Sequence, residues 1–562
     1  MWSTILSFCV FTILVQGQED WRLVNITQGP VRGQKDPDGG LYVFYNIPYA
    51  TAPTGIDRFK APLPPPVWMS PLNAVNRNIR CPQPGMGGNI QEDCLVVNLF
   101  VPDTTDTNLP VLVMVHGGAF QFGDGLFDQY RELVRTKKLI AVSFNYRLGV
   151  HGFLCLGTEG APGNAGIKDQ IALLRWLNAN IARFGGNPND VTLVGCSAGS
   201  GSVDVLTLSS ATTGLFQKAI LESGSSTGAV GVIIDPIQNA KNYAKVLNFD
   251  NVDDLESLEE FYRTAPFQLL TSRVDQITNN KDTTVRFGPC VERDIGQERA
   301  IMDAPMDVIK RGNYTKVPLV YGFTNMEGAM RLPMFNTWKD QMNEKFSDFL
   351  PAELHFENDE VREQVAQRVK EFYFKDNDVS EETVVQYILY FTDVLFAYPM
   401  LKSLSARVEA LGDTIYLFEY SFVDDTTPSF PHTDVRGAQH CWQTIAVADQ
   451  DLSRRTEEYK RMVQIAREYT LNFVLSGVPS STDAGFPTWH PATATRSPHM
   501  SIGPVIDMKD DILGDRAAFW DSIYEEYYGG PLVPDSSTGG APSTMISKFI
   551  LMAILSMFYL VW

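Results

Sequence analysis

The chain has 562 residues, of which 44% are hydrophobic and 20% are charged, and its formal net charge at pH 7 is −20. A chain of this length and apolar content can bury a large core. Its acidic balance argues against binding to nucleic acid, which requires clustered lysines and arginines.

The chain begins with the features of a secretory signal peptide. Residues 1–17 contain an apolar stretch that ends at Gly17, just before the first acidic residues, Glu19 and Asp20. The basic residues that usually precede such a stretch are missing. We expect residues 1–17 to be removed during export.

The cysteines agree with an exported protein. Six cysteines remain once Cys9 leaves with the signal, and Cys81 and Cys94 bracket a short loop that a disulfide could close. Such a bond would contribute about 3 kcal/mol in the chain-entropy model. The chain contains no CxxC pair, so we expect no metal site.

Strands and helices alternate in the first half of the chain. Apolar runs in residues 109–120 and 138–149 are typical of strands covered on both faces, and apolar residues recur at helical spacing in 164–186. A third buried strand follows at 190–195. This alternation predicts an α/β fold with a large, mostly parallel central sheet, helices on both faces and right-handed crossovers.

The second half of the chain extends the same sheet. Residues 240–415 are mostly helical and charged, with one buried strand and its loop at 316–328, and a late strand is expected at 413–422. Neither repeats nor low-complexity linkers interrupt the chain between its two ends. We therefore expect one domain, residues 18–530, with helical insertions.

A nucleophile motif lies at the end of the third strand. Gly195-Cys196-Ser197-Ala198-Gly199 is G-x-S-x-G, preceded by "VTLV" and followed by a helix-compatible segment. In a tight strand-to-helix turn, only small residues fit around the serine, whose hydroxyl then projects above the sheet. The context favours a nucleophilic Ser197 over a simple glycine turn.

An oxyanion hole is expected upstream of this serine. Residues 116–120, "HGGAF", follow a buried strand and place Gly117 and Gly118 in succession. Backbone N–H groups stabilise an oxyanion well because they are fixed before the charge develops. We expect Gly117, Gly118 and Ala198 to supply the three donors.

These motifs resemble the type-B carboxylesterase and cholinesterase family of α/β-hydrolases. The resemblance covers residues 20–528 and includes "EDCLVVNLFVP", "NYRLGVHGFL", "GNAGIKDQ" and "FGGNPNDVTLVGCSAG". It implies a serine esterase that needs no cofactor. It also implies a Cys81–Cys94 disulfide and buried structural charges at Arg147, Asp169 and Glu92.

The resemblance also implies the remaining catalytic residues. Glu327, in "GFTNMEGAM", matches the acid of the family, and His440, in "RGAQHCWQT", matches its histidine. His440 would take the proton of Ser197 and return it to the leaving alcohol, and Glu327 would orient the imidazole. His116 and His432 are rival histidines, but neither has this setting.

The chain departs from the family beside the two catalytic residues. Cys196 stands where glutamate is common, Gln443 where an acid is common, and Cys441 where glycine is usual. We favour the interpretation that the two cysteines pack as small apolar groups. The alternative is that they lie close enough to bond, which would lock or misplace His440.

These neutral replacements weaken the case for cationic substrates. The Cys81–Cys94 loop also lacks the tryptophan with which cholinesterases bind choline through a cation–π contact. We therefore expect hydrolysis of an uncharged carboxylic ester through an acyl-enzyme. Juvenile hormone esterases are relatives in this family, but they usually have glutamine before the nucleophile, so Cys196 argues against that role.

The alternative function is binding or adhesion without catalysis, as in neuroligin-like members of the family.

The C-terminal end of the chain and two sequons also indicate a cell-surface protein. Residues 531–562 form a small-polar spacer followed by an apolar tail that is short for a membrane span, the pattern of a GPI-attachment signal. Ser537 is the candidate attachment residue. Asn25 and Asn313 begin N-x-T sequons and are candidate glycosylation sites. We expect an extracellular protein tethered to the outer membrane leaflet, with a soluble secreted form as the alternative.

Overall fold

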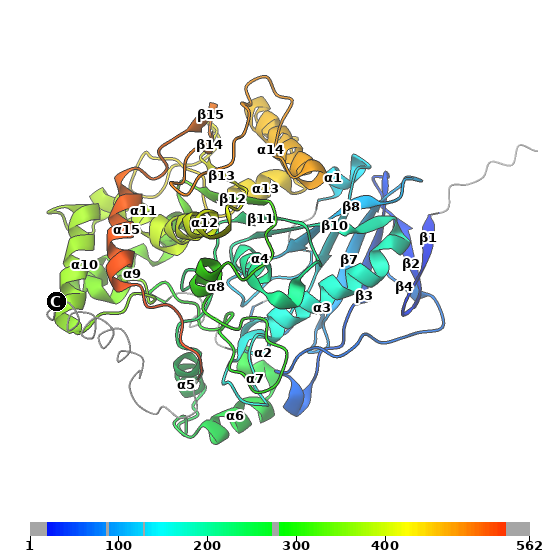
Figure 1. Cartoon of the computed structure of the whole chain (residues 1–562), viewed down its shortest axis with the longest axis horizontal. Coiled ribbons are helices and arrows are strands. Elements are labelled where there is room, and N and C mark those ends of the chain that lie inside the picture. Colours follow the sequence, from blue (N-terminus) through cyan, green and yellow to red (C-terminus); the bar gives the residue numbers. More distant parts are fainter. Residues whose placement is uncertain (1–19, 86–88, 127–129, 273–279, 535–562) are drawn as a thin grey trace, which may run out of the picture.

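The structure is a computed structural model that describes residues 20–85, 89–126, 130–272 and 280–534. The segment expected to be a signal peptide, the apolar C-terminal tail and the candidate attachment residue Ser537 therefore lie outside the described residues. Figure 1 shows the chain coloured along its sequence, with elements labelled where there is room.

One mixed sheet of thirteen strands organises the described part of the chain. Twelve of its strands follow the order β1-β2-β3-β7-β9-β8-β10-β11-β12-β13-β14-β15, and β4 pairs with β2. The strands of this order are β1 (Trp21–Ile26), β2 (Gly29–Lys35), β3 (Leu41–Pro48), β7 (Val96–Pro102), β9 (Ile140–Phe144), β8 (Leu109–Val115), β10 (Gly186–Cys196), β11 (Lys218–Glu222), β12 (Leu319–Thr324), β13 (Ile415–Tyr420), β14 (His499–Ile502) and β15 (Ile506–Lys509). The side strand is β4 (Leu72–Asn73), while β5 (Ile79–Arg80) and β6 (Asn89–Ile90) form a separate pair.

The centre of the sheet is parallel and its two margins are antiparallel. Within this order all neighbours from β9 through β14 run parallel, whereas β1, β2, β3, β7 and β15 make antiparallel pairs. The side strand β4 runs parallel to β2. The expected strands in 109–120, 138–149, 190–195, 316–328 and 413–422 are all present, which confirms the α/β fold. The antiparallel strands at the margins were not among the expected ranges, although β7 is buried at every position and β3 at most of its positions.

Both faces of the central strands are buried, which explains their uninterrupted apolar character. In β8, Val111, Val113 and Val115 belong to one core cluster. The alternating residues Leu112 and Met114 belong to a second cluster on the other face. Successive side chains of a strand point to opposite faces, so a strand between two helical layers must be apolar at every position.

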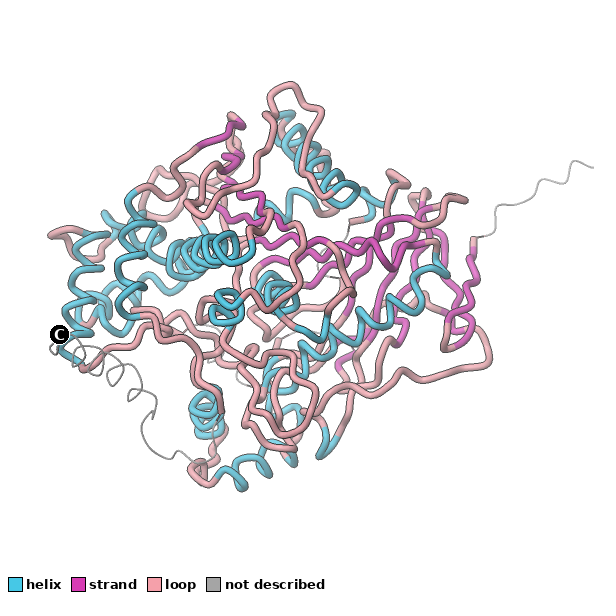
Figure 2. The backbone as a smooth tube through the Cα atoms, in the orientation of Figure 1, coloured by secondary structure: helices cyan, strands magenta, loops and turns pink. Residues whose placement is uncertain are grey.

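The helices cover these two faces and one end of the sheet. They are α1 (Arg131–Arg135), α2 (Gly149–Phe153), α3 (Ala165–Asn180), α4 (Ala198–Leu208), α5 (Pro236–Val246), α6 (Leu255–Thr264), α7 (Phe267–Leu270), α8 (Pro305–Arg311), α9 (Phe335–Glu344), α10 (Asp359–Phe374), α11 (Val384–Thr392), α12 (Tyr398–Leu411), α13 (Trp442–Val447), α14 (Glu457–Ser476) and α15 (Asp515–Tyr527). Figure 1 shows α3 and α4 across the strands from α1 and α14. The strands form the continuous band between these helices in Figure 2.

A third core cluster lies in the helical part contributed by α9, α10, α11 and α15, which gather at one end of the sheet in Figure 1. The helical stretch Glu381–Leu411 is long and apolar enough to cross a membrane by length and composition. However, 83% of its most apolar window is buried within the protein. Its apolar character is therefore explained by packing in this core.

Two disulfides join residues that lie outside the named strands and helices. Cys81 is bonded to Cys94, and Cys155 is bonded to Cys290. The buried pair Arg147–Asp169 also belongs to this scaffold, with the guanidinium 2.6 Å from the carboxylate. These contacts join segments that lie outside the strands of the sheet.

Candidate active site

Three predicted site residues follow the carboxyl ends of neighbouring strands. Ser197 follows β10, Glu327 follows β12, and His440 lies in the segment between β13 and α13. Because β10, β11, β12 and β13 are adjacent and parallel, their carboxyl ends lie at the same edge of the sheet. Open α/β sheets generally bind their ligands at this edge, outside the carboxyl ends of the strands.

Ser197 occupies the strand-to-helix turn that its motif predicts. Its φ is 60° and its ψ is −128°, and its N–H donates to the Glu222 carbonyl at 2.9 Å. A Cβ added to Gly195 would lie 2.4 Å from the carbonyl carbon of Gly199. A Cβ on Gly199 would lie 2.1 Å from the Val115 carbonyl oxygen. Both glycines of the motif are therefore required by close backbone packing.

The glycines after β8 lie directly against this turn. A Cβ added to Gly117 would lie 2.7 Å from the Cys196 carbonyl oxygen and 3.2 Å from the Cβ of Ser197. Gly118 has φ of 107° and approaches Phe122 so closely that no side chain fits. Within the described residues, neither glycine N–H donates to a protein acceptor. These N–H groups are available to a ligand beside the serine.

Ala198 adds a third N–H group at the same place. It is the first residue of α4, and the first N–H groups of a helix have no partner within the helix. The partial positive charge of the helix end also favours an anion here.

Glu327 is completely buried behind this edge. Its Oε1 accepts hydrogen bonds from the Ser223 hydroxyl at 2.5 Å and from the Thr324 N–H at 2.7 Å. Its Oε2 lies 2.5 Å from Nδ1 of His440. The two oxygens are thus divided between the scaffold and the imidazole.

The contact with Glu327 fixes which nitrogen of His440 faces outward. With Nδ1 bonded to the carboxylate, Nε2 has no hydrogen-bond partner among the described residues. The ring of Phe396, from the π-helical turn η8 (Asp393–Ala397), stacks on the imidazole at a centroid distance of 4.3 Å. The imidazole is therefore held by a carboxylate at one nitrogen and by an aromatic ring on one face.

Gln443 is linked to Glu327 through a hydrogen bond to Ser223. Its amide donates to the Ser223 hydroxyl at 2.7 Å, and Ser223 donates in turn to Glu327. Gln443 is completely buried. The neutral side chain of Gln443 therefore takes part in the hydrogen bonds of the site and contributes no charge.

The favoured interpretation of Cys196 and Cys441 as apolar packing groups is wrong, because the two are joined by a disulfide. Their Cα atoms are 6.1 Å apart. Sequence alone did not show that the turn after β10 meets the turn before α13. The bond connects the residue before Ser197 to the residue after His440.

The rival histidines have other roles. His116 is buried and stacks on Tyr146, and its Nδ1 contacts the Gly117 carbonyl at 2.8 Å. Burial lowers the pKa of His116 to about 4, so the imidazole is neutral near pH 7. His432 lies 3.3 Å from Glu381 instead of facing the serine.

The sequence did not point to Ser223, Thr444 or Phe396. Ser223 follows β11, the strand between β10 and β12, so its position after a buried strand was the one available signal. The Thr444 hydroxyl donates to the Glu222 carboxylate. The contact of Phe396 with His440 depends on how η8 packs, which periodicity does not specify.

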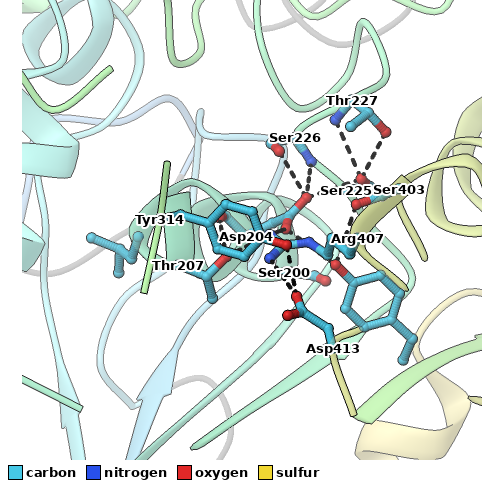
Figure 3. A network of polar contacts seen from close by, with 12 residues as sticks. Ser200, Asp204, Thr207, Ser225, Ser226, Thr227, Tyr314, Ser403, Arg407 and Asp413 are labelled. Atoms are coloured by element: carbon cyan, nitrogen blue, oxygen red, sulfur yellow. Dashed lines mark hydrogen bonds and ion pairs between the residues drawn. The ribbon is translucent and has the colours of Figure 1, made fainter. Parts of the chain in front are cut away.

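A second buried network supports the helix that begins beside Ser197 (Figure 3). Asp204 of α4 accepts from Arg407 of α12 at 2.7 Å and from the Ser226 N–H at 2.7 Å. The Ser200 hydroxyl donates to the Gly224 carbonyl at 2.6 Å. Both side chains of the ion pair are at most 1% exposed. The network fixes α4 to the loop after β11 and to α12.

No cluster of three or more histidine, cysteine, aspartate or glutamate side chains suited to a metal ion occurs among the described residues. The chemistry available at this edge is that of a hydroxyl, an imidazole, a carboxylate and backbone N–H groups. This set is suited to acyl transfer.

Known proteins are similar in sequence to this chain over most of its length. The sequence model of the carboxylesterase family matches residues 20–520. A carboxylic ester hydrolase of Bombus ignitus is 29% identical over 528 residues, which cover 89% of this chain and 94% of that protein. Esterase FE4 of Myzus persicae is 30% identical over 467 residues, covering 79% and 82% of the two chains.

The fold also matches a solved structure. The crystal structure of juvenile hormone esterase from Manduca sexta, with OTFP covalently attached, gives a TM-score of 0.79 at 28% sequence identity. The match covers 90% of this chain and 100% of that chain. It therefore extends over the sheet and the helices that surround the candidate site.

Proposed function

Because this chain belongs to the carboxylesterase family of α/β-hydrolases and is a carboxylic ester hydrolase, we propose that Ser197 is its nucleophile, His440 its general base and Glu327 the acid that orients the base. The observation that carries the proposal is the 2.5 Å contact between His440 and Glu327, at the sheet edge where the Ser197 turn lies. The three residues follow one another in the order serine, acid, histidine, as in other α/β-hydrolases.

Acylation begins with proton transfer from the Ser197 hydroxyl to Nε2 of His440. Since Nδ1 is bonded to Glu327, the neutral imidazole carries its proton there and Nε2 accepts. The serine oxygen attacks the ester carbonyl, and His440 then gives the proton to the leaving alcohol. An acyl-enzyme on Ser197 remains.

Deacylation repeats these steps with water. His440 removes a proton from a water molecule, which attacks the acyl carbonyl and releases the carboxylic acid and the free serine. The covalent attachment of OTFP in the Manduca sexta structure supports a covalent route for this fold.

The negative oxygen of both tetrahedral intermediates is stabilised by the N–H groups of Gly117, Gly118 and Ala198. The close packing of Gly117 on Ser197 supports this role. Donors fixed in place before the charge develops contribute the most to the rate, typically about 10²- to 10³-fold for one donor.

We propose an uncharged ester as the substrate. A disulfide sulfur and an amide occupy the two positions, 196 and 443, at which related enzymes commonly carry acids. The Cys81–Cys94 loop contains no tryptophan to receive a quaternary ammonium group. A cationic alcohol group would thus gain little at this site.

Two esters of similar shape test this proposal. Acetylcholine and its neutral carbon isostere, 3,3-dimethylbutyl acetate, differ in charge alone, and we expect a higher kcat/KM for the neutral ester. Ser197→Ala should abolish turnover of both. A higher kcat/KM for acetylcholine would refute the substrate class, and binding of esters without turnover would favour the non-catalytic alternative.

We further propose that the protein is exported, that residues 18–530 form a single domain, and that a GPI anchor is attached at Ser537, within the C-terminal spacer and signal segment 531–562. Three disulfides suit an oxidising compartment. Asn25 and Asn313, the proposed glycosylation sites, are exposed. Treatment of expressing cells with phosphatidylinositol-specific phospholipase C should release the protein, and Ser537→Pro should abolish surface retention. Retention that survives the phospholipase would contradict the anchor.

A further inference from the structure

The first turn of α13 is fastened to the ends of two neighbouring strands. Cys196, the last residue of β10, pairs in register with Glu222, the last residue of β11. Cys441 is bonded to Cys196, and the Thr444 hydroxyl donates to the Glu222 carboxylate. Both attachments lie on residues that closely follow His440. These two attachments therefore restrict the position of the His440 imidazole along the sheet edge.

The backbone of Cys441 has a conformation that residues with a side chain adopt infrequently. Its φ is 65° and its ψ is 15°, in the left-handed region that favours glycine. A residue with a side chain stays in this region when the surrounding structure over-determines its conformation. The covalent bond to Cys196 contributes one such constraint, because it restricts the direction of the Cα–Cβ bond of Cys441.

We propose that the Cys196–Cys441 disulfide is a positioning element of the catalytic centre, which holds the segment carrying His440 in register with the turn carrying Ser197. The inference rests on the proposed function of these two residues. In this proposal the bond holds the His440 segment from the side of Ser197, while Glu327 holds Nδ1 of the ring at 2.5 Å. Opening the bond allows Cys441 to leave the left-handed region, and this change in the backbone displaces the neighbouring His440.

The location of the bond makes this role accessible to chemical test. Cys441 is half-buried, whereas the four cysteines of the other two disulfides are at most 1% exposed. A dithiol reductant supplies the two electrons needed. One thiolate attacks a sulfur of the disulfide to give a mixed disulfide, and the second thiolate displaces the protein sulfur. The reductant becomes a cyclic disulfide, and Cys196 and Cys441 become thiols.

The first experiment follows turnover of a neutral ester by the folded protein during reduction with dithiothreitol. Aliquots are alkylated with iodoacetamide, and mass spectrometry identifies the cysteines that have been freed. We expect kcat to fall about 10- to 100-fold in proportion to opening of Cys196–Cys441, with KM changed less than about twofold, since small misplacements of a catalytic group have effects of this size. Reoxidation should restore kcat.

Variants separate positioning from a general effect on stability. Cys196→Ala with Cys441→Ala should reproduce the loss of kcat. Cys196→Ala with Cys441→Gly should recover part of it, because glycine adopts a φ of 65° without strain. The matched control, Cys155→Ala with Cys290→Ala, removes another buried long-range disulfide and should lower thermal stability with kcat unchanged.

The outcomes are distinct. A kcat that stays constant or rises as Cys196–Cys441 opens would overturn the inference, as would equal losses of kcat in the control variant. If the alanine variant does not fold, reduction of the native protein decides the question. If the oxidised protein neither hydrolyses esters nor reacts with a fluorophosphonate, the proposed function fails first, together with the inference that rests on it.

Discussion

The side-chain amide of Gln443 donates a hydrogen bond to the hydroxyl of Ser223, 2.7 Å away. The single proton of Ser223 is directed to Glu327, at 2.5 Å, so the serine oxygen must accept from its other neighbour. An amide donates at every pH, whereas a carboxyl group donates only while it is protonated. Gln443 thus keeps the chain of hydrogen bonds to the catalytic carboxylate independent of pH.

Gln443→Glu should therefore make turnover depend on pH. The introduced carboxyl group would be buried near the charge of Glu327, and both effects raise its pKa. As pH rises and this group ionises, it competes for the proton of Ser223. We expect kcat close to that of the original protein at acidic pH and at least about 10-fold lower near pH 8. Parallel pH profiles of the two proteins would contradict this account.

Ser223→Gly should weaken catalysis without straining the backbone. The φ of Ser223 is 55°, which glycine adopts readily. The substitution therefore removes the hydroxyl without straining the backbone. A hydrogen bond to a charged group contributes about 1.5–3 kcal/mol, and its loss predicts a decrease in kcat/KM of about 10- to 100-fold. Steady-state kinetics on a neutral ester checks this. An unchanged kcat/KM would mean that Glu327 does not depend on this contact.

Asp204→Asn should destabilise the fold strongly. The change leaves the buried guanidinium of Arg407 without its main counter-charge, and breaking a buried pair costs about 3–5 kcal/mol. Glu298→Gln serves as the control, because its partner Arg175 is about half exposed and such pairs contribute about 0–1 kcal/mol. Urea unfolding measures both free energies. Similar losses in the two variants would be inconsistent with the role of the network.

His151→Phe should reduce the loss of stability in acid. His151 is buried, and burial, with the charges of Arg58 and Arg147, lowers its pKa to about 3. The unfolded chain binds a proton below about pH 6.5 while the folded protein does not, so stability falls as pH decreases from about 6.5 towards 3. The variant should lack this contribution, which approaches about 1.4 kcal/mol per pH unit. Urea unfolding between pH 7 and pH 5 tests it, and equal slopes for both proteins would refute it.

The central strands could be predicted from the sequence because buried parallel strands leave a continuous apolar signal. The candidate site residues could then be placed after the ends of these strands. The turns at Ser197 and Gly117 were also predictable, since close packing requires glycine at fixed spacing around them. Once the order of strands places neighbouring carboxyl ends together, residues far apart in the chain come to one edge.

What could not be predicted depends on how separate segments meet. The Cys196–Cys441 bond requires the turn before α13 to lie against β10, and neither segment carries a local signal for the other. The stacking of Phe396 on His440 likewise depends on the π-helical turn in an otherwise ordinary apolar helix. Tertiary packing determines both contacts.

Reaction of the purified, oxidised protein with a fluorophosphonate, followed by peptide mapping, tests the central claim most directly. The account predicts one phosphonyl group per chain, carried on Ser197, and no reaction in Ser197→Ala. Absence of labelling, or labelling that persists in Ser197→Ala, would contradict it.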